Sequence, residues 1–132
     1  MKIQFKAGAA TSIITPPLGT PLYGYAFQRK ATKVNDDLRA TAIAVKQGEL
    51  KAILISVDVV SIGVDLGDKV RKQIEEETTV PFKNITISAT HTHSGPAMKT
   101  AKGWGSANES YIDEIFIPWV KQDSKSLTQK KN

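Results

Sequence analysis

Both histidines of this chain lie in one short stretch, where a β-branched run stops and a Gly-Pro pair begins. The stretch covers residues 85–96 and reads Ile-Thr-Ile-Ser-Ala-Thr-His-Thr-His-Ser-Gly-Pro. Side chains alternate between the two faces of an extended segment, so we expect His91 and His93 to project to the same side at the end of one strand. Two imidazoles placed in this way can share a metal ion or lie on either side of one substrate.

Zinc is the metal that this pair of side chains suggests. Neutral imidazole nitrogen is a good zinc ligand, and a catalytic zinc site usually takes three protein ligands and leaves one position for water. The two histidines supply at most two of these ligands. Thr90, Thr92 and Ser94 add hydroxyls that can orient the imidazoles or bind a substrate. The alternative, two polar residues in a surface loop, stays open because His-x-His is less diagnostic than a paired Cys-x-x-Cys set.

The elements around the histidines predict where they lie. Residues 50–57 are nearly continuous in apolar side chains and predict a central strand covered on both faces, followed by a helix at 64–78 and a strand at 84–89. This order predicts a right-handed crossover and a parallel strand pair. Asp58 and His91 then emerge at the carboxyl edge of the sheet, where α/β proteins usually bind ligands. Asp58 is a candidate metal ligand, a partner of a histidine, or simply a cap of the following turn.

The rest of the chain predicts the other elements of one domain. A strand is expected at 4–14, a long loop at 15–37, and a hairpin that joins a strand at 38–46 to the strand at 50–57. Ser110 with Asp113 resembles a capping box at the start of a helix that Pro118 kinks or shifts. We therefore expect a single α/β domain with a mixed β-sheet, comprising residues 1–121, and a frayed polar basic tail at 122–132.

Composition excludes several functional classes. With 132 residues, 40% of them hydrophobic and 23% charged, the chain is typical of a globular protein. No apolar run reaches the roughly 18 to 20 residues of a membrane-spanning helix, and the N-terminus has no secretory signal, so we expect a cytoplasmic protein. Cysteine is absent, which leaves His, carboxylate, Tyr or backbone oxygen for a metal. The net charge of +5 gathers near the C-terminus without interleaved aromatic residues, and we expect no nucleic-acid partner.

The string from Ala89 to Pro96 resembles the signature of the neutral (alkaline, non-lysosomal) ceramidase family, zinc-dependent amidases that cleave the N-acyl bond of ceramide. Further matches to the family pattern lie at 13–17 (Ile-Ile-Thr-Pro-Pro), 24–26 (Gly-Tyr-Ala) and 57–58 (Val-Asp), and at Asp36, Leu38 and Ala40. Asn35, Arg39 and Thr41 depart from it, since the family often has His, Tyr and Arg there.

The resemblance implies a role for each matched residue. His91 would be a zinc ligand, with Asp58 as a second candidate, and His93 would lie beside the metal and assist binding or proton transfer. Gly24 would sit in the loop that approaches the reacting carbonyl, and Tyr25 and Ser94 would contact the substrate, a ceramide-like N-acyl lipid or another small amide.

The family draws its remaining zinc ligands and a catalytic serine from sequence further on than this chain extends. We therefore expect a ceramidase-type zinc amidohydrolase whose site is incomplete, and inactive, in the isolated chain. The alternative is a non-catalytic metal- or ligand-binding fragment that assembles with another chain or forms a homo-oligomer, through the apolar helix face of Ile112, Ile115, Phe116 and Trp119.

Overall fold

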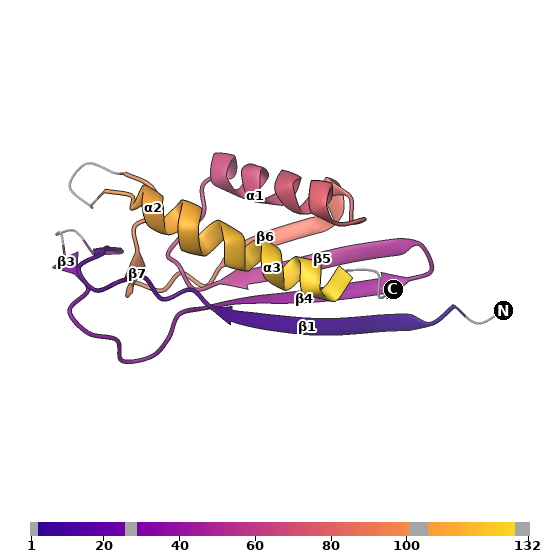
Figure 1. The fold of residues 1–132 in the computed structure, drawn as a ribbon, viewed down its shortest axis with the longest axis horizontal. Coiled ribbons are helices and arrows are strands. Elements are labelled where there is room, and N and C mark those ends of the chain that lie inside the picture. The colour runs from indigo at the N-terminus through magenta and orange to yellow at the C-terminus, as the bar shows by residue number, and fades with distance from the viewer. Residues whose placement is uncertain (1–2, 26–28, 101–105, 129–132) are drawn as a thin grey trace.

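A four-stranded mixed sheet forms the main layer of the fold in the computed structural model, which describes residues 3–25, 29–100 and 106–128 (Figure 1). Its strand order is β1-β4-β5-β6. The strands are β1 (Phe5–Ile13), β4 (Arg39–Gln47), β5 (Leu50–Val57) and β6 (Ile85–Ala89). The β1/β4 and β4/β5 pairs are antiparallel and the β5/β6 pair is parallel, which confirms the predicted α/β domain with a mixed sheet.

The predicted hairpin and crossover are both present. Gly48 has a φ of 59°, which suits the tight two-residue turn between β4 and β5. Helix α1 (Val64–Glu77) connects β5 to β6, and it buries Val70 and Ile74 as its apolar spacing predicts. A short 3₁₀ helix, η1 (Phe82–Asn84), follows Pro81 and leads into β6.

The prediction that β5 is covered on both faces is wrong. Ile53, Ile55 and Val57 are buried, whereas Leu54 on the opposite face is 50% exposed. The reason is the placement of the helices, because α1 and the C-terminal helix lie on the same side of the sheet (Figure 1). Ile43, the partner of Leu54 on β4, is 45% exposed for the same reason. The result is a two-layer domain with one open sheet face.

The C-terminal helical segment starts two residues before the predicted capping box. The side chain of Asn108 accepts a hydrogen bond from the backbone N–H of Tyr111, so Asn108 is the cap and Ser110 only donates to it. The segment comprises α2 (Glu109–Tyr111), a π-helical turn η2 (Ile112–Phe116) and α3 (Ile117–Thr128). The widened turn ends at Phe116, two residues before Pro118, which lacks a backbone N–H.

Helix α3 covers the sheet, and its apolar face belongs to the core of the chain. Val120 of α3 is buried, as are Ile112 and Phe116 of the preceding turn η2, so the predicted apolar surface for a second chain does not exist as such, although Trp119 is 48% exposed. The buried Tyr111 hydroxyl donates to the carbonyl of Ile14 at 2.6 Å, and burial raises the pKa of this tyrosine. The core cluster includes Ile14, Ile53, Ile55, Val57, Val70, Ile74, Ile85, Phe116 and Val120.

The expected frayed tail from Gln122 onward is wrong as far as Thr128. Helix α3 continues through this segment, and Asp123 and Ser124 are buried in it. The Ser12 hydroxyl of β1 donates to a carboxylate oxygen of Asp123 at 2.8 Å, which ties the helix to the edge strand. The predicted boundary after residue 121 therefore falls inside a helix, and the last part of the basic tail, 129–132, lies outside the described residues.

The predicted long loop contains two short strands that build a second sheet. Strands β2 (Pro21–Tyr23) and β3 (Arg29–Lys30) pair with each other, and β2 also pairs with β7 (Gly95–Pro96), in the order β3-β2-β7. This small sheet lies at one end of the main sheet, opposite the end that holds the chain termini (Figure 1). It joins the early loop to the segment directly after His93.

Candidate functional site

The candidate site lies at the carboxyl edge of the parallel pair β5/β6. The backbone N–H of Thr90 donates to the carbonyl of Val57 at 3.0 Å, and that of His91 donates to the carbonyl of Val59 at 3.1 Å. These bonds hold the segment after β6 against the segment after β5. Asp58 and His91 thus leave the sheet at the same edge, as the predicted parallel pairing requires.

His91 does not continue the strand, and in this respect the prediction of an extended His-x-His segment is wrong. Strand β6 ends at Ala89, and His91 has a φ of 69°. Positive φ is uncommon for a non-glycine residue and disfavoured by its Cβ, so the backbone bond to Val59 and the contacts of the ring must hold it there. Such constrained residues are common at functional sites.

The ring of His91 is fixed in one tautomer. Its Nδ1 lies 2.8 Å from the backbone carbonyl of Val60, and because a carbonyl can only accept, Nδ1 carries the proton. In the neutral ring Nε2 then carries the lone pair, which is the nitrogen that could bind a metal. The bond to Val60 is the kind of outer contact that orients a metal-binding imidazole.

The two imidazoles and one tyrosine form a contiguous ring cluster. The ring centroids of His91 and His93 are 4.9 Å apart, and those of His93 and Tyr25 are 5.4 Å apart, both in edge-to-face arrangements. His91 is exposed, and His93 is partly buried between its two neighbours. The structure therefore brings together three of the predicted site residues, from two segments almost 70 positions apart.

Gly24 is held against His93 by the small sheet. Tyr23 pairs with Gly95, so the next residue, Gly24, lies beside the chain that enters β7. A Cβ at position 24 would lie 2.7 Å from Cγ, 2.8 Å from Cβ and 2.9 Å from Cα of His93. Gly24 also has a φ of 126°. Two independent features therefore require glycine here, namely the backbone conformation and the close approach of the backbone to His93.

Arg29 is a site residue that the sequence analysis missed. Its Nη2 donates to the backbone carbonyl of His93 at 3.1 Å, and its guanidinium lies 4.2 Å from the centroid of the Tyr25 ring. Arginine thus connects the backbone of one ring residue to the face of another. Strands of two and three residues have no detectable periodicity, so only their pairing reveals this contact.

Asp58 has a structural partner and does not join the histidines. Its Oδ2 accepts from the backbone N–H of Arg39 at 2.9 Å, while its own N–H donates to the Arg39 carbonyl. In the described part of the chain no three His, Asp or Glu side chains gather in a way that could hold a metal ion. This contact joins the end of β5 to the start of β4, which is neither a histidine contact nor a cap of the turn that follows Asp58.

Ser94 lines a cavity of about 630 Å³ beside the ring cluster. Thr92, Arg29, Lys30 and Asp37 also line it, together with apolar side chains such as Leu22, so the cavity carries charges of both signs on a partly apolar wall. Its volume is within the range of small-molecule sites. The two histidines stand next to this cavity and do not line it.

Comparison with known proteins gave a result only at the level of structure. A scan against models of protein families gave no match, and a search of curated protein sequences gave none either. The structure of neutral ceramidase from Pseudomonas aeruginosa superposes with a TM-score of 0.78 and 18% sequence identity, over 98% of this chain. A structure described as ceramidase complexed with C2 gives a TM-score of 0.78 at 17% identity, over 97% of this chain.

This chain shares its fold with part of neutral ceramidase. It spans 22% of the length of each ceramidase chain that it matches. The histidine segment lies at the carboxyl edge of the parallel pair, as the strand-helix-strand order predicted. Among the described residues no helix is long and apolar enough to span a membrane.

Proposed function

We propose that this chain is the part of a ceramidase-type zinc amidohydrolase that carries the two histidines of the zinc site and the adjoining substrate-contacting loop. The reaction would be hydrolysis of the N-acyl bond of a ceramide-like lipid to a sphingoid base and a fatty acid. The observation that carries the proposal is the fixed tautomer of His91, with Nδ1 bonded to the carbonyl of Val60 and Nε2 available beside His93, on a ceramidase-like fold.

The donor set of this chain fits part of a zinc site. His91 offers Nε2, and His93 offers a second imidazole in ring contact with it, which suits the nitrogen ligands that zinc prefers. A catalytic zinc site needs a third protein ligand, which the described residues do not bring to this position. When bound, zinc acts as a Lewis acid toward the amide carbonyl. We therefore expect the isolated chain to bind zinc and to have no turnover.

The neighbouring residues have roles that their contacts support. His93 is partly buried between His91 and Tyr25, a position from which an imidazole can take up or release a proton near the reacting amide. Gly24 lets the backbone of the small sheet approach the ring of His93. Tyr25, which belongs to the ring cluster, and Ser94, which lines the adjacent cavity, would contact the substrate. Arg29 would hold the Tyr25 ring and the His93 backbone at a fixed position relative to each other.

Zinc titration of the purified chain against a competing chromophoric chelator tests this proposal. We expect zinc affinity to fall by at least about tenfold in His91→Ala, because loss of an outer contact alone costs that much at metal sites. His93→Ala is the matched variant, and it should weaken binding less. Nitrogen NMR of the metal-free chain should show Nδ1 of His91 protonated, as its bond to Val60 requires. Equal zinc affinity of the wild type and His91→Ala would refute the assignment.

A fluorogenic N-acyl-sphingosine measures turnover separately. We expect no hydrolysis by the isolated chain, because it lacks the third ligand. Zinc-dependent hydrolysis that His91→Ala abolishes would show that this chain is a complete enzyme and would overturn the fragment hypothesis.

An assembly module is the second candidate function, and the open sheet face favours it. Two adjacent rows of side chains on this face are apolar: Ala9, Ile43 and Leu54 in one row, and Ala7, Val45 and Ala52 in the next. The row on the other side of them holds Thr11, Thr41 and Ser56, so three neighbouring rows carry no charge. These three rows hold no lysine or arginine, so two copies with a net charge of +5 can meet over them without opposed cations, and Arg39 lies one row further on, opposite Ile13. We propose a second copy of the chain as the partner.

Sedimentation velocity over a range of protein concentrations tests this second candidate. The wild type should form dimers, and Leu54→Lys should remain monomeric because it places a charge in the apolar row. Val64→Lys is the matched control, since Val64 is 77% exposed at the start of α1, away from this face. If the wild type is monomeric at every concentration, the proposal that this face binds a second copy of the chain is wrong.

A further inference from the structure

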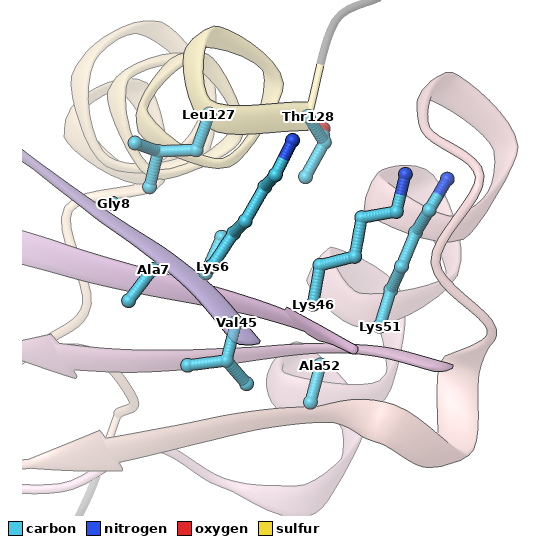
Figure 2. Close-up of a pocket in the computed structure, with 10 residues that line it drawn as sticks. Lys6, Ala7, Gly8, Val45, Lys46, Lys51, Ala52, Leu127 and Thr128 are labelled. Carbon is cyan, nitrogen blue, oxygen red and sulfur yellow. The ribbon is translucent and has the colours of Figure 1, made fainter. Parts of the chain in front are cut away.

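Three lysines form one row at the end of the main sheet that lies opposite the histidines. Lys6 on β1 pairs with Lys46 on β4, and Lys46 pairs with Lys51 on β5. Directly opposed residues on neighbouring antiparallel strands have Cβ atoms about 4.5 to 5.5 Å apart. The three side chains therefore leave the same face of the sheet side by side, as Figure 2 shows.

The row lies on the face that α3 covers, just beyond the last turn of this helix. Gly8, two residues after Lys6, faces α3, since a Cβ there would lie 3.2 Å from a methyl carbon of Leu127. The lysines, Leu127 and Thr128 line a cavity of about 350 Å³ (Figure 2). Among the described residues that line it there is no carboxylate. The cavity thus has a cationic wall on the sheet side and a helix end on the other.

Like charges placed opposite each other on neighbouring strands destabilise a sheet. Within the described residues the ion pairs are Arg71 with Asp68 and Lys121 with Glu77, so no lysine of the row takes part in one. Lys51 donates from Nζ to the hydroxyl of Thr79 at 2.7 Å, a neutral partner that leaves its charge in place. The described residues therefore place no negatively charged side chain against these three adjacent cations.

The end of α3 accounts for only part of this charge. A helix C-terminus carries about half a negative charge and attracts lysine side chains. Figure 2 shows Lys6 directed toward the last turn of α3, whereas Lys46 and Lys51 lie beside each other at the opposite side of the cavity. One lysine suffices for the helix end, so the charges of the exposed Lys46 and the partly exposed Lys51 are available to an anion.

We propose that the lysine row is a binding site for a phosphate dianion, either free or as the headgroup of a lipid. A dianion matches the charge that remains after the helix end is satisfied, and lysine binds phosphate as a point charge. The cavity exceeds the volume of phosphate alone, and Leu127 gives it an apolar side that a phosphate monoester can contact. This site is independent of the proposed zinc chemistry, because it lies at the other end of the sheet.

Isothermal titration with inorganic phosphate tests the site. The wild type should bind, and its unfolding temperature should rise with phosphate concentration because a ligand stabilises the state that binds it. Lys46→Gln should weaken binding about tenfold or more, as loss of a charge-assisted hydrogen bond would, and Lys46→Arg should restore most of it. Lys69→Gln removes an equal charge from the exposed face of α1 and should change the affinity less than twofold.

Vesicles separate the two sources of phosphate. Binding to phosphatidylcholine vesicles that contain phosphatidic acid, absent with phosphatidylcholine alone and lost in Lys46→Gln, assigns a lipid headgroup, whereas binding of inorganic phosphate without vesicle binding assigns a soluble ligand. The proposal is overturned if neither probe binds, or if Lys69→Gln weakens binding as much as Lys46→Gln. It is also overturned if Lys46→Gln lowers the unfolding temperature without phosphate, since removing a repelling charge should not do so.

Discussion

The two ends of the main sheet hold their polar side chains by different means. At the histidine end, backbone hydrogen bonds, a positive φ at His91 and the close approach of Gly24 fix the rings before any ligand arrives. At the lysine end, three long side chains share a register, and within the described part of the chain only Lys51 of the three makes a side-chain hydrogen bond, to Thr79. The first arrangement is preorganised, as chemistry on a bound substrate requires, and the second is electrostatic and adjustable.

This difference makes the two ends respond differently to substitution. A change of shape should damage the histidine end, because its rings are packed against backbone. A change of charge should matter most at the lysine end, because its side chains can reorient around a ligand. Substitutions that change the shape of a side chain without its charge, or its charge without its shape, therefore test whether the two ends differ in this way.

The largest effect should come from Gly24→Ala. The positive φ costs about 1 to 3 kcal/mol for a residue with a Cβ, and the contact with His93 adds about 1 to 3 kcal/mol as overpacking does. Chemical denaturation should therefore show a loss of stability well above that of an ordinary surface change. The ring resonances of His93 should shift in the same variant if it still folds.

Gly19→Ala is the matched control for this change. Gly19 also has a positive φ, 87°, but a Cβ there would meet nothing within 4 Å. The difference between the two variants therefore isolates the contact with His93. Equal losses of stability would mean that Gly24 matters only for its backbone conformation, and that the histidine end is less tightly packed than we describe.

The sequence predicted the elements that have a clear periodicity or a strong turn signal. The strand of residues 50–57, the helix at 64–77 and the parallel strand after it follow from apolar spacing and from Pro81, and they place Asp58 and His91 at one edge. The ceramidase-like fold agrees with the resemblance of the histidine string. The predicted roles of His91, His93, Gly24, Tyr25 and Ser94 in chemistry remain predictions.

The sequence could not predict features that depend on contacts between distant segments. Strands β2, β3 and β7 have two or three residues each, too few for a periodic pattern, so the contact of Arg29 with His93 was not visible. The exposed face of β5 was missed because its residues are apolar on both faces, and an apolar residue such as Leu54 does not by itself show whether its face is covered. The tail after Gln122 was misjudged because Asp123 is polar yet buried against Ser12.

The smallest effect should come from Asp123, which anchors α3 before the turn that lines the lysine cavity. Burial raises the pKa of this carboxyl, and the hydrogen bond from Ser12 opposes part of that shift. The folded state thus holds the proton more tightly than the unfolded chain, so this group's contribution to stability is fully present below its ordinary pKa and is lost as pH rises through the raised value. Asn cannot ionise, and Asp123→Asn should escape this loss.

The difference in unfolding free energy between Asp123→Asn and the wild type should therefore increase with pH across that window and stay constant above it. Denaturation at a series of pH values measures it, with Asp113→Asn, at an exposed position of η2, as the control. Hydrogen exchange should locate the gain in α3, beside the lysine row, and leave the β2/β7 pair at the histidine end unchanged. A gain of the same size at both ends would mean that the ends are coupled through the core and do not hold their side chains independently.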